Sequence, residues 1–373
     1  MKITEIETIP LSVPVSPARV LASARDSHAV SPFLLVRIRT DEGLVGTGEV
    51  SCTPRWSGED AAIAQRVITR YFAPLLTGED PRAVQRLTLR LDGEIVGHYF
   101  AKAGIEMALW DILGKSLDAP LHVLLGGAVR DRVRTKFSIS GTDPAGAAEL
   151  GGWAVEQGFT AMKVKVARGS VADDIERIAA VRATIGDDVR LGVDANCGWT
   201  RDAARAALPG LVDHGIAFLE QPVGLRDLAG MAELRVGSTI PVVADDPIGT
   251  STDALDAVRA EAADVLSVYV GMAGGVAAAQ RVAAVATAAG IGWTIGSNLE
   301  LGVALAAQMH LAVATPGLAD ETVPCDLLSP FYYDELLLAE PLPLEAGWAY
   351  PPVGPGLGVE LDDEQVDRYR ADR

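Results

Sequence analysis

Hydrophobic residues follow one arrangement in the first third of the chain and another in the rest. Over residues 1–13, apolar side chains stand among polar ones as in a half-buried strand. Phe33–Arg39 and Leu44–Val50 are also strand-like, and the turn Asp41-Glu42-Gly43 between them predicts a hairpin. Helical periodicity predicts three helices, over Ala61–Leu76, Pro81–Leu91 and Lys102–Leu117. The first part of the chain is therefore expected to form an α+β unit.

From about residue 135, short apolar runs alternate with amphipathic stretches of helical length. Seven runs have the strand pattern: Phe137–Ile139, Ala161–Val166, Arg190–Ala195, Ile216–Glu220, Pro241–Asp245, Val265–Val270 and Ile291–Ile295. We expect a further strand near His310–Ala314. Intervening helices such as Val171–Ile185 and Arg201–His214 follow Ser or Thr caps. Seven or eight βα units at roughly even spacing favour a parallel barrel over an open sheet.

Composition narrows the classes of partner. The 373 residues carry a formal net charge of −18, which argues against nucleic acid and anionic membranes, because both require a basic surface. No apolar run is long enough to span a membrane. The three scattered cysteines, Cys52, Cys197 and Cys325, form neither a disulfide framework nor a zinc pattern. These features predict a cytoplasmic protein without membrane or nucleic-acid partners.

Two lysines stand two residues apart in the apolar run that contains Lys163 and Lys165. The period of a strand places both ammonium groups on one face. Two like charges held close on a buried strand should lower each other's pKa, which makes a lysine a usable base. An edge strand protected by lysines is the alternative interpretation of the pair.

The next three strands each end in a carboxylate. Asp194, Glu220 and Asp245 follow Lys165 at intervals of about one βα unit, so they should stand side by side at the catalytic end of a barrel. Carboxylates this close would repel one another, and each would resist ionisation. A hard divalent cation resolves the repulsion, and an all-oxygen ligand set suits Mg²⁺. The strand ends therefore predict a metal site.

These residues give the chain a family resemblance. It resembles the enolase superfamily, and within it the muconate-lactonizing (muconate cycloisomerase) subgroup of the mandelate racemase and muconate lactonizing enzymes. The resemblance covers nearly the whole chain. Besides the strand ends, it is carried by Val45-Gly46-Thr47-Gly48-Glu49, by the helix from Met107 to Lys115, and by Leu124-Leu125-Gly126-Gly127.

The resemblance implies a modified TIM barrel, (β/α)7β, with an N-terminal α+β capping domain. The capping domain is expected over residues 1–130, completed by the tail 341–373, and the barrel over residues 131–340. Mg²⁺, with Mn²⁺ as an alternative, is expected on Asp194, Glu220 and Asp245. The implied reaction removes the proton alpha to a small substrate's carboxylate through an enediolate, with Lys165 as acid/base and Lys163 in support. Relatives suggest a homo-oligomer, either a dimer or an octamer.

The chain departs from this pattern at the sixth strand. Members of the subgroup usually carry another lysine there, on the opposite face of the substrate, at a fixed interval before a Gly-Gly pair. Counting back from Gly274-Gly275 reaches Tyr269, and no lysine follows Lys165. Nor does the seventh strand supply the histidine of a mandelate-racemase-type dyad. A second departure is Asp246-Pro247, where relatives commonly have Glu-Ser. This shorter acid bears on the support of the metal site and not on the ligand Asp245.

Further residues are candidates for support or substrate contact. Asn196 and Gln221 are expected to hydrogen-bond the metal ligands or the lysines. Glu300 follows the seventh strand, and it is either an active-site residue or a helix N-terminal acid. The two capping loops, where the family determines substrate choice, carry Arg25, His28, Arg55 and Trp56.

Three functions remain open at this point. The first is a one-base cycloisomerase or dehydratase (lyase) that uses Lys165, with Tyr269 as a candidate acid. The second is a racemase or epimerase of an amino-acid derivative, in which Tyr269 serves the second face, although an ordinary tyrosine is a poor base. The third is a barrel that binds a metal and a ligand without catalysis.

Overall fold

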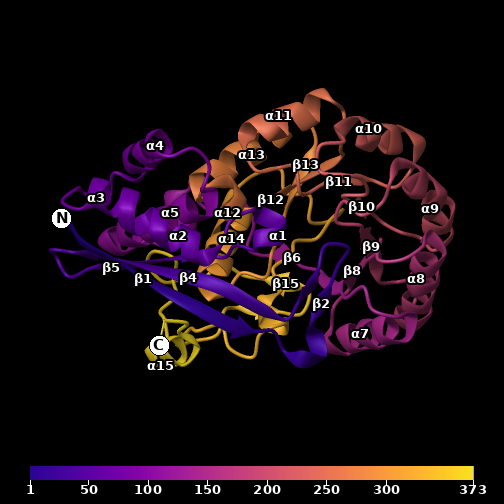
Figure 1. Ribbon diagram of the computed structural model, residues 1–373, viewed down its shortest axis with the longest axis horizontal. Coiled ribbons are helices and arrows are strands. Elements are labelled where there is room, and N and C mark those ends of the chain that lie inside the picture. Colours follow the sequence, from indigo (N-terminus) through magenta and orange to yellow (C-terminus); the bar gives the residue numbers. More distant parts are fainter. Residues whose placement is uncertain (373) are drawn as a thin grey trace.

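Three antiparallel strands begin the computed structural model, which describes residues 1–372. They are β1 (Ile3–Pro14), β4 (Val30–Thr40) and β5 (Val45–Val50), in the order β1-β4-β5. The predicted hairpin is β4–β5, and β1 adds the third strand along the other side of β4. In Figure 1 this sheet and its helices lie to one side of the barrel.

Helices cover this sheet, and the last of them, α5 (Tyr99–Leu117), packs directly on β5. Glycines allow the close approach: a Cβ built on Gly48 would lie 1.8 Å from the carbonyl oxygen of Gly104. Any side chain at Gly48 would therefore push helix and strand apart. The helical segments before α5 are α2 (Ala61–Val67), the π turn Ile68–Phe72, α3 (Ala73–Leu76) and α4 (Val84–Glu94).

Seven parallel strands in chain order form the wall of the barrel. They are β7 (Phe137–Ile139), β8 (Ala161–Lys165), β9 (Arg190–Asp194), β10 (Leu219–Glu220), β11 (Val242–Ala244), β12 (Val265–Val268) and β13 (Gly292–Ile295). The main helices between them are α7 (Pro144–Gln157), α8 (Val171–Ile185), α9 (Arg201–Asp213), α10 (Leu228–Gly237), α11 (Ser251–Arg259) and α13 (Val276–Ala288). These helices surround the strands in Figure 1. The predicted barrel class is confirmed.

The prediction of a strand near His310–Ala314 is wrong, because these residues form the end of helix α14 (Gly302–Ala314). Every residue of α14 is buried, so its sequence shows no polar face by which a helix could be recognised. The eighth barrel position is instead filled by residues 318–326. Leu318 bridges to Trp293 of β13, and Cys325 bridges to Thr135 just before β7, both in parallel orientation.

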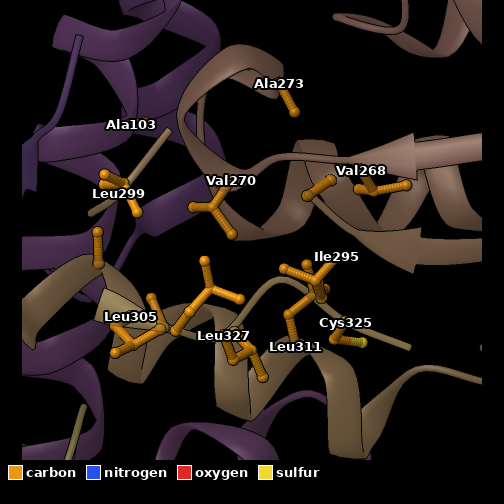
Figure 2. Close-up of a cluster of buried hydrophobic side chains, with 14 of the residues drawn as sticks. Ala103, Val268, Val270, Ala273, Ile295, Leu299, Leu305, Leu311, Cys325 and Leu327 are labelled. Atoms are coloured by element: carbon orange, nitrogen blue, oxygen red, sulfur yellow. The ribbon is translucent and has the colours of Figure 1, made fainter. Parts of the chain in front are cut away.

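The hydrophobic core is continuous between the two parts of the molecule. Figure 2 shows Ala103 of α5 in the same cluster of buried side chains as Val268 of β12, Ile295 of β13 and Leu305 and Leu311 of α14. The capping part is therefore held over one end of the barrel by a shared core. Among residues 1–372, no helix is both long and apolar enough to cross a bilayer.

Short elements complete the connection. The hairpin β2 (Leu21–Ala22) and β3 (Ser27–His28) and the helix α1 (Pro54–Ser57) form the two capping loops. The tail returns to the N-terminal part, where Arg370, just after α15 (Asp363–Tyr369), bridges to Leu11 of β1. A small sheet joins β14 (Leu344–Glu345) and β15 (Trp348–Ala349) to β6 (Val133–Arg134).

Candidate active site

The candidate residues gather where the parallel strands end. In the strand register Lys165 pairs with Asp194, and Asp194 pairs with Glu220, so three adjacent strands end at one level. Asp245 comes directly after β11, one strand further on. All four side chains are buried, with at most 7% of each residue exposed.

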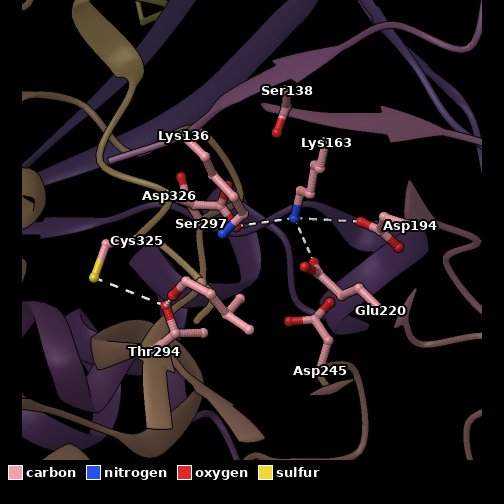
Figure 3. Close-up of polar contacts among 12 residues, drawn as sticks. Lys136, Ser138, Lys163, Asp194, Glu220, Asp245, Thr294, Ser297, Cys325 and Asp326 are labelled. Atoms are coloured by element: carbon pink, nitrogen blue, oxygen red, sulfur yellow. Dashed lines mark hydrogen bonds and ion pairs between the residues drawn. The ribbon is translucent and has the colours of Figure 1, made fainter. Parts of the chain in front are cut away.

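Ammonium groups and carboxylates form one buried network, which Figure 3 shows around Lys163. The Nζ of Lys163 donates to Oε1 of Glu220 and lies 3.4 Å from Oδ2 of Asp194. The Nζ of Lys165 donates to Oδ2 of Asp194 at 2.5 Å and to Oδ1 of Asn196 at 2.9 Å. The two lysines of β8 therefore share Asp194 but otherwise have different partners.

The network shifts the pKa values of its members in different directions. Burial raises the pKa of Asp194, but Lys165 and Lys163 together outweigh it and hold that pKa well below its ordinary value. Burial raises the pKa of Glu220 well above its usual range despite Lys163, with Asp194 and Asp245 adding to the rise. Burial and then the charge of Asp194 also raise the pKa of Asp245. Mutual repulsion among the carboxylates is thus only partly relieved by the lysines.

The expectation that the paired lysines lower each other's pKa is wrong for Lys163. Burial acts to lower its pKa, but the carboxylates of Asp326, Glu220 and Asp194 outweigh burial and raise it well above the ordinary value. The neighbours that decide the charge of Lys163 are therefore acids from other segments of the barrel rather than Lys165. This environment keeps Lys163 protonated and suits it to electrostatic support.

Asp326 is a residue of this network that the sequence analysis missed. Its Oδ2 accepts from Lys163 at 2.9 Å and lies 3.0 Å from the Nζ of Lys136, which is wholly buried. The interior of the barrel thus holds three lysines rather than two. Asp326 ends the irregular segment 318–326, where Pro324 interrupts any strand pattern, so no apolar run marked it as a strand-end acid.

Tyr269 occupies the position of the missing sixth-strand lysine, and its hydroxyl is bound within the network. The Oη donates to Oδ1 of Asp245 at 2.6 Å. Burial and then the charge of Asp245 raise the pKa of Tyr269 well above its ordinary value. The ring packs against Trp56, with centroids 4.9 Å apart. In this arrangement the hydroxyl of Tyr269 is a hydrogen-bond donor, and its ring is part of an aromatic wall.

Asp246 fastens both capping loops to the barrel. Its Oδ1 accepts from Arg25 Nη2 at 2.7 Å and from Trp56 Nε1 at 2.8 Å, and its Oδ2 accepts from Cys197 Sγ at 3.4 Å. Burial, followed by the charge of Asp245, raises the pKa of Asp246 to about 7. Asp246 therefore supports the site by anchoring the loops that cover it.

A cavity of about 100 Å³ opens onto the network. It is lined by both lysines, the three strand-end carboxylates, Asn196 and Tyr269, and by Arg25, His28, Arg55 and Trp56 from the capping loops. Ser297 and Asn298, which were not predicted, also line it. The capping loops and the strand ends thus meet around one small chamber.

Besides Asp246, two predicted residues do not line this cavity. Gln221 accepts through Oε1 from the backbone N of Asp245 at 3.0 Å, so it holds the end of β11 in place. Glu300 is a buried residue of the loop between β13 and α14, where it accepts from the hydroxyl of Ser297. Both act on neighbouring backbone or side chains, and neither faces the chamber.

The donor set fits a hard divalent cation. Asp194, Glu220 and Asp245 supply only oxygens, and burial, with repulsion from the neighbouring carboxylates, raises the pKa of Glu220 and Asp245. Within residues 1–372 no three acidic, His or Cys side chains form a ready-made cation site. Lys163 donates to one oxygen of Glu220, Lys165 to one oxygen of Asp194 and Tyr269 to one oxygen of Asp245.

Family models match both parts of the chain. The model described as the mandelate racemase / muconate lactonizing enzyme N-terminal domain matches residues 5–126, and the enolase C-terminal domain-like model matches residues 146–366. The chain belongs to the mandelate racemase and muconate lactonizing enzyme family. It is therefore an enzyme of the enolase superfamily, and the predicted resemblance is confirmed.

Relatives within this family differ in reaction. The chain is 34% identical over 341 residues to the chloromuconate cycloisomerase of Cupriavidus pinatubonensis, covering 90% of each protein. It is 32% identical over 313 residues to the N-succinyl-L-Arg/Lys racemase of Bacillus cereus, covering 84% of each. Cycloisomerases and racemases are thus similarly distant from this chain.

The similar solved structures also include both a cycloisomerase and an epimerase. The 2-chloromuconate cycloisomerase from Rhodococcus opacus has a TM-score of 0.95 and 29% identity, with all of both chains covered. The dipeptide epimerase from Enterococcus faecalis, complexed with Mg and the dipeptide L-Leu-L-Tyr, has a TM-score of 0.91 and 28% identity. That comparison covers 96% of this chain and 100% of the epimerase.

Proposed function

We propose that this enzyme is a Mg²⁺-dependent lyase or cycloisomerase that uses a single base, Lys165, on the carbon alpha to the carboxylate of a small substrate. The observation that carries this proposal is the asymmetry of the site. Lys165 stands at the end of β8, whereas the opposite strand, β12, is followed by Tyr269, whose hydroxyl is bound to Asp245. Only one side of the chamber therefore offers an amine as a base.

Each residue has a role in the proposed reaction. Lys165, as the free amine, takes the α-proton, and the electron pair moves into the carboxylate to give an enediolate. Mg²⁺ held by Asp194, Glu220 and Asp245 would supply positive charge for that anion, and Lys163 adds a fixed ammonium. In a dehydration the enediolate expels hydroxide from the next carbon, and Lys165 returns its proton to form water. Cycloisomerisation uses the same residue, with a carboxylate oxygen as the leaving group or nucleophile.

A screen in D₂O tests this proposal. Small carboxylates (cycloisomerase substrates, acid sugars, hydroxyproline and amino-acid derivatives) are incubated with enzyme and Mg²⁺, and α-proton exchange and product formation are followed by NMR. We expect Lys165→Ala to lose about 10²–10⁴-fold in turnover, the usual contribution of a general base. The exposed Lys2 supplies a matched control, Lys2→Ala, which should behave as wild type. Turnover that survives Lys165→Ala would disprove the proposal.

Epimerisation is the second candidate, because the B. cereus racemase and the E. faecalis epimerase are among the relatives. It requires a proton acceptor on each face, so Tyr269 would have to act as tyrosinate. Tyr269→Phe distinguishes the two candidates, since phenylalanine keeps the packing on Trp56 and removes only the hydroxyl. We expect this variant to keep turnover within about tenfold at saturating Mg²⁺, with weaker Mg²⁺ binding. Deuterium in a product of inverted configuration, lost in Tyr269→Phe, would establish the epimerase instead.

A further inference from the structure

His28 lines the catalytic cavity from the first capping loop and is the start of a chain of hydrogen bonds into the core. Its Nε2 contacts the hydroxyl of Ser31, which lies 2.5 Å from the Oη of Tyr333. Tyr333 in turn contacts the carbonyl oxygen of Leu299 at 3.0 Å. Ser31 and Tyr333 are both buried, with 2% and 3% of each residue exposed. No step of the proposed reaction uses this series of hydrogen bonds.

The last member of the chain determines the direction of every hydrogen bond. The carbonyl of Leu299 can only accept, so Tyr333 donates its single hydroxyl proton to it. Tyr333 must therefore accept from Ser31. The single hydroxyl proton of Ser31 is then used as well, so Ser31 must accept from His28. The ring of His28 therefore carries a proton on Nε2. Burial raises the pKa of Tyr333 far above its ordinary value, so the phenol keeps its proton throughout the usable pH range.

The second ring nitrogen, Nδ1, makes no hydrogen bond to any residue within 1–372. Burial lowers the pKa of His28, although the nearby charge of Asp26 acts in the opposite direction. The half-buried imidazole is thus neutral near pH 7, and Nδ1 offers a lone pair.

We propose that Nδ1 of His28 accepts a hydrogen bond from the substrate, so that the substrate carries a hydroxyl, amine or amide N–H donor in addition to its carboxylate. The inference rests on the proposed function, because it assigns a substrate class to the same chamber. A dicarboxylate without a donor, such as muconate, would bring a second set of lone pairs toward Nδ1. His28 is then a specificity-determining residue that disfavours the substrates of the cycloisomerase relatives.

Nitrogen NMR tests the tautomer without any ligand. The chain has five histidines, so ¹⁵N-labelling of histidine gives a spectrum in which His28 is assigned by its loss in His28→Gln. We expect the neutral Nε2–H tautomer at pH 7.5. Tyr333→Phe should change this state, because Ser31 is then free to donate to the ring instead of accepting from it. A wild-type His28 that is doubly protonated, or that carries its proton on Nδ1, would overturn the inference.

Substitution and matched ligands test the substrate class. The amide of His28→Gln reaches the position of Nε2 and can still donate to Ser31, but it leaves no acceptor at the position of Nδ1. The probes are 3-hydroxybutanoate and 3-methoxybutanoate, N-acetyl-L-alanine and its N-methyl analogue, and cis,cis-muconate, each followed by α-proton exchange or turnover with Mg²⁺. We expect the donor-bearing member of a pair to react about tenfold faster, as one neutral hydrogen bond allows, and His28→Gln to remove most of this preference.

The outcomes separate this inference from the proposed function. Exchange that depends on Lys165 but is equal for donor and methylated probes, or equal in wild type and His28→Gln, overturns the role of His28 and leaves the one-base reaction standing. Efficient turnover of cis,cis-muconate by wild type has the same consequence. A preference for donors that persists in binding to Lys165→Ala, without any exchange dependent on Lys165, supports His28 and rejects the one-base reaction. A panel in which no donor-bearing probe exchanges or binds more tightly than its methylated partner rejects the substrate class.

Discussion

At the scale of single residues, Asp326 balances the charge of two buried lysines, although it lies outside the regular strands of the barrel. It is the one carboxylate in the described part of the network that contacts both Lys163 and Lys136. Asp326 and the two lysines are almost fully buried. Burial raises the pKa of Asp326, but Lys136 and Lys163 outweigh it and lower that pKa below the ordinary value. Removing this charge would take from Lys136 its carboxylate partner and from Lys163 one of three nearby carboxylates.

Asp326→Asn should therefore destabilise the protein strongly. Breaking a buried ion pair by neutralising one partner typically costs about 3–5 kcal/mol, because the other charge stays buried. We expect a loss of that order in the free energy of unfolding, measured with urea. The double variant Lys136→Met/Asp326→Asn removes one orphaned charge and should regain part of the loss. Equal stability of wild type and Asp326→Asn would show that the network does not depend on this carboxylate.

At the scale of elements, the same residue shows where prediction from sequence succeeds and fails. Asp194, Glu220 and Asp245 could be predicted because each ends an apolar run, and because successive βα units place such ends side by side. Asp326 could not, since residues 318–326 form a barrel edge through isolated bridges rather than a regular strand. Helix α14 was missed because it is buried on all sides, which removes the polar face that identifies a helix.

Contacts between elements could not be predicted from the sequence either. The position of Asp246 beside Asp245 suggested support of the metal site, and the family comparison marked it as a departure. Its actual partners, Arg25 and Trp56, are 221 and 190 residues away in the chain. Only the folded arrangement brings the hairpin β2–β3 and helix α1 to one carboxylate. The residues at the strand ends can thus be predicted from the sequence, whereas the contacts that anchor the loops over them cannot.

Asp246→Ala should loosen both capping loops together. Without the carboxylate, Arg25 and the indole N–H of Trp56 lose a shared acceptor, and we expect faster amide hydrogen exchange over β2–β3 and α1. Turnover should fall about tenfold or more through kcat/KM, since the loops line the chamber. Asp246→Glu keeps the charge and restores the acceptor that relatives commonly carry, so it is the matched control. Faster exchange in only one of the loops would contradict a common anchor.

At the scale of the whole molecule, Glu49 joins the capping part to the barrel. It lies on β5, is almost wholly buried, and accepts from the backbone N of Leu301 at 2.7 Å and of Ala304 at 3.0 Å, at the start of α14. A carboxylate at a helix N-terminus satisfies amides that have no partner within the helix. The family motif Gly46-Thr47-Gly48-Glu49 thus ends in a contact between the two parts of the protein, not in the chamber.

This contact makes the stability of the molecule depend on pH. Burial raises the pKa of Glu49 to about 7 in the folded state, against an ordinary value of 4.5. Below pH 4.5 the group is protonated in both states, and above pH 7 it is ionised in both. Between these values only the folded state holds the proton, so stability falls as pH rises through this window, by about 1.4 kcal/mol per pH unit and about 3 kcal/mol in all.

Glu49→Gln isolates this dependence, because glutamine keeps a side-chain acceptor for α14 but does not titrate. We expect the free energy of unfolding of wild type, measured with urea between pH 4.5 and 8, to fall more steeply than that of Glu49→Gln. Burial also raises the pKa of Glu300 and Asp246 to about 7, and both groups remain in the variant. The share of Asp246 cancels in the difference, whereas the difference includes the repulsion between Glu300 and Glu49, which also raises the pKa of Glu49. Parallel curves for the two proteins would mean that Glu49 is ionised in the folded state throughout this range, with the amides of Leu301 and Ala304 compensating for its burial.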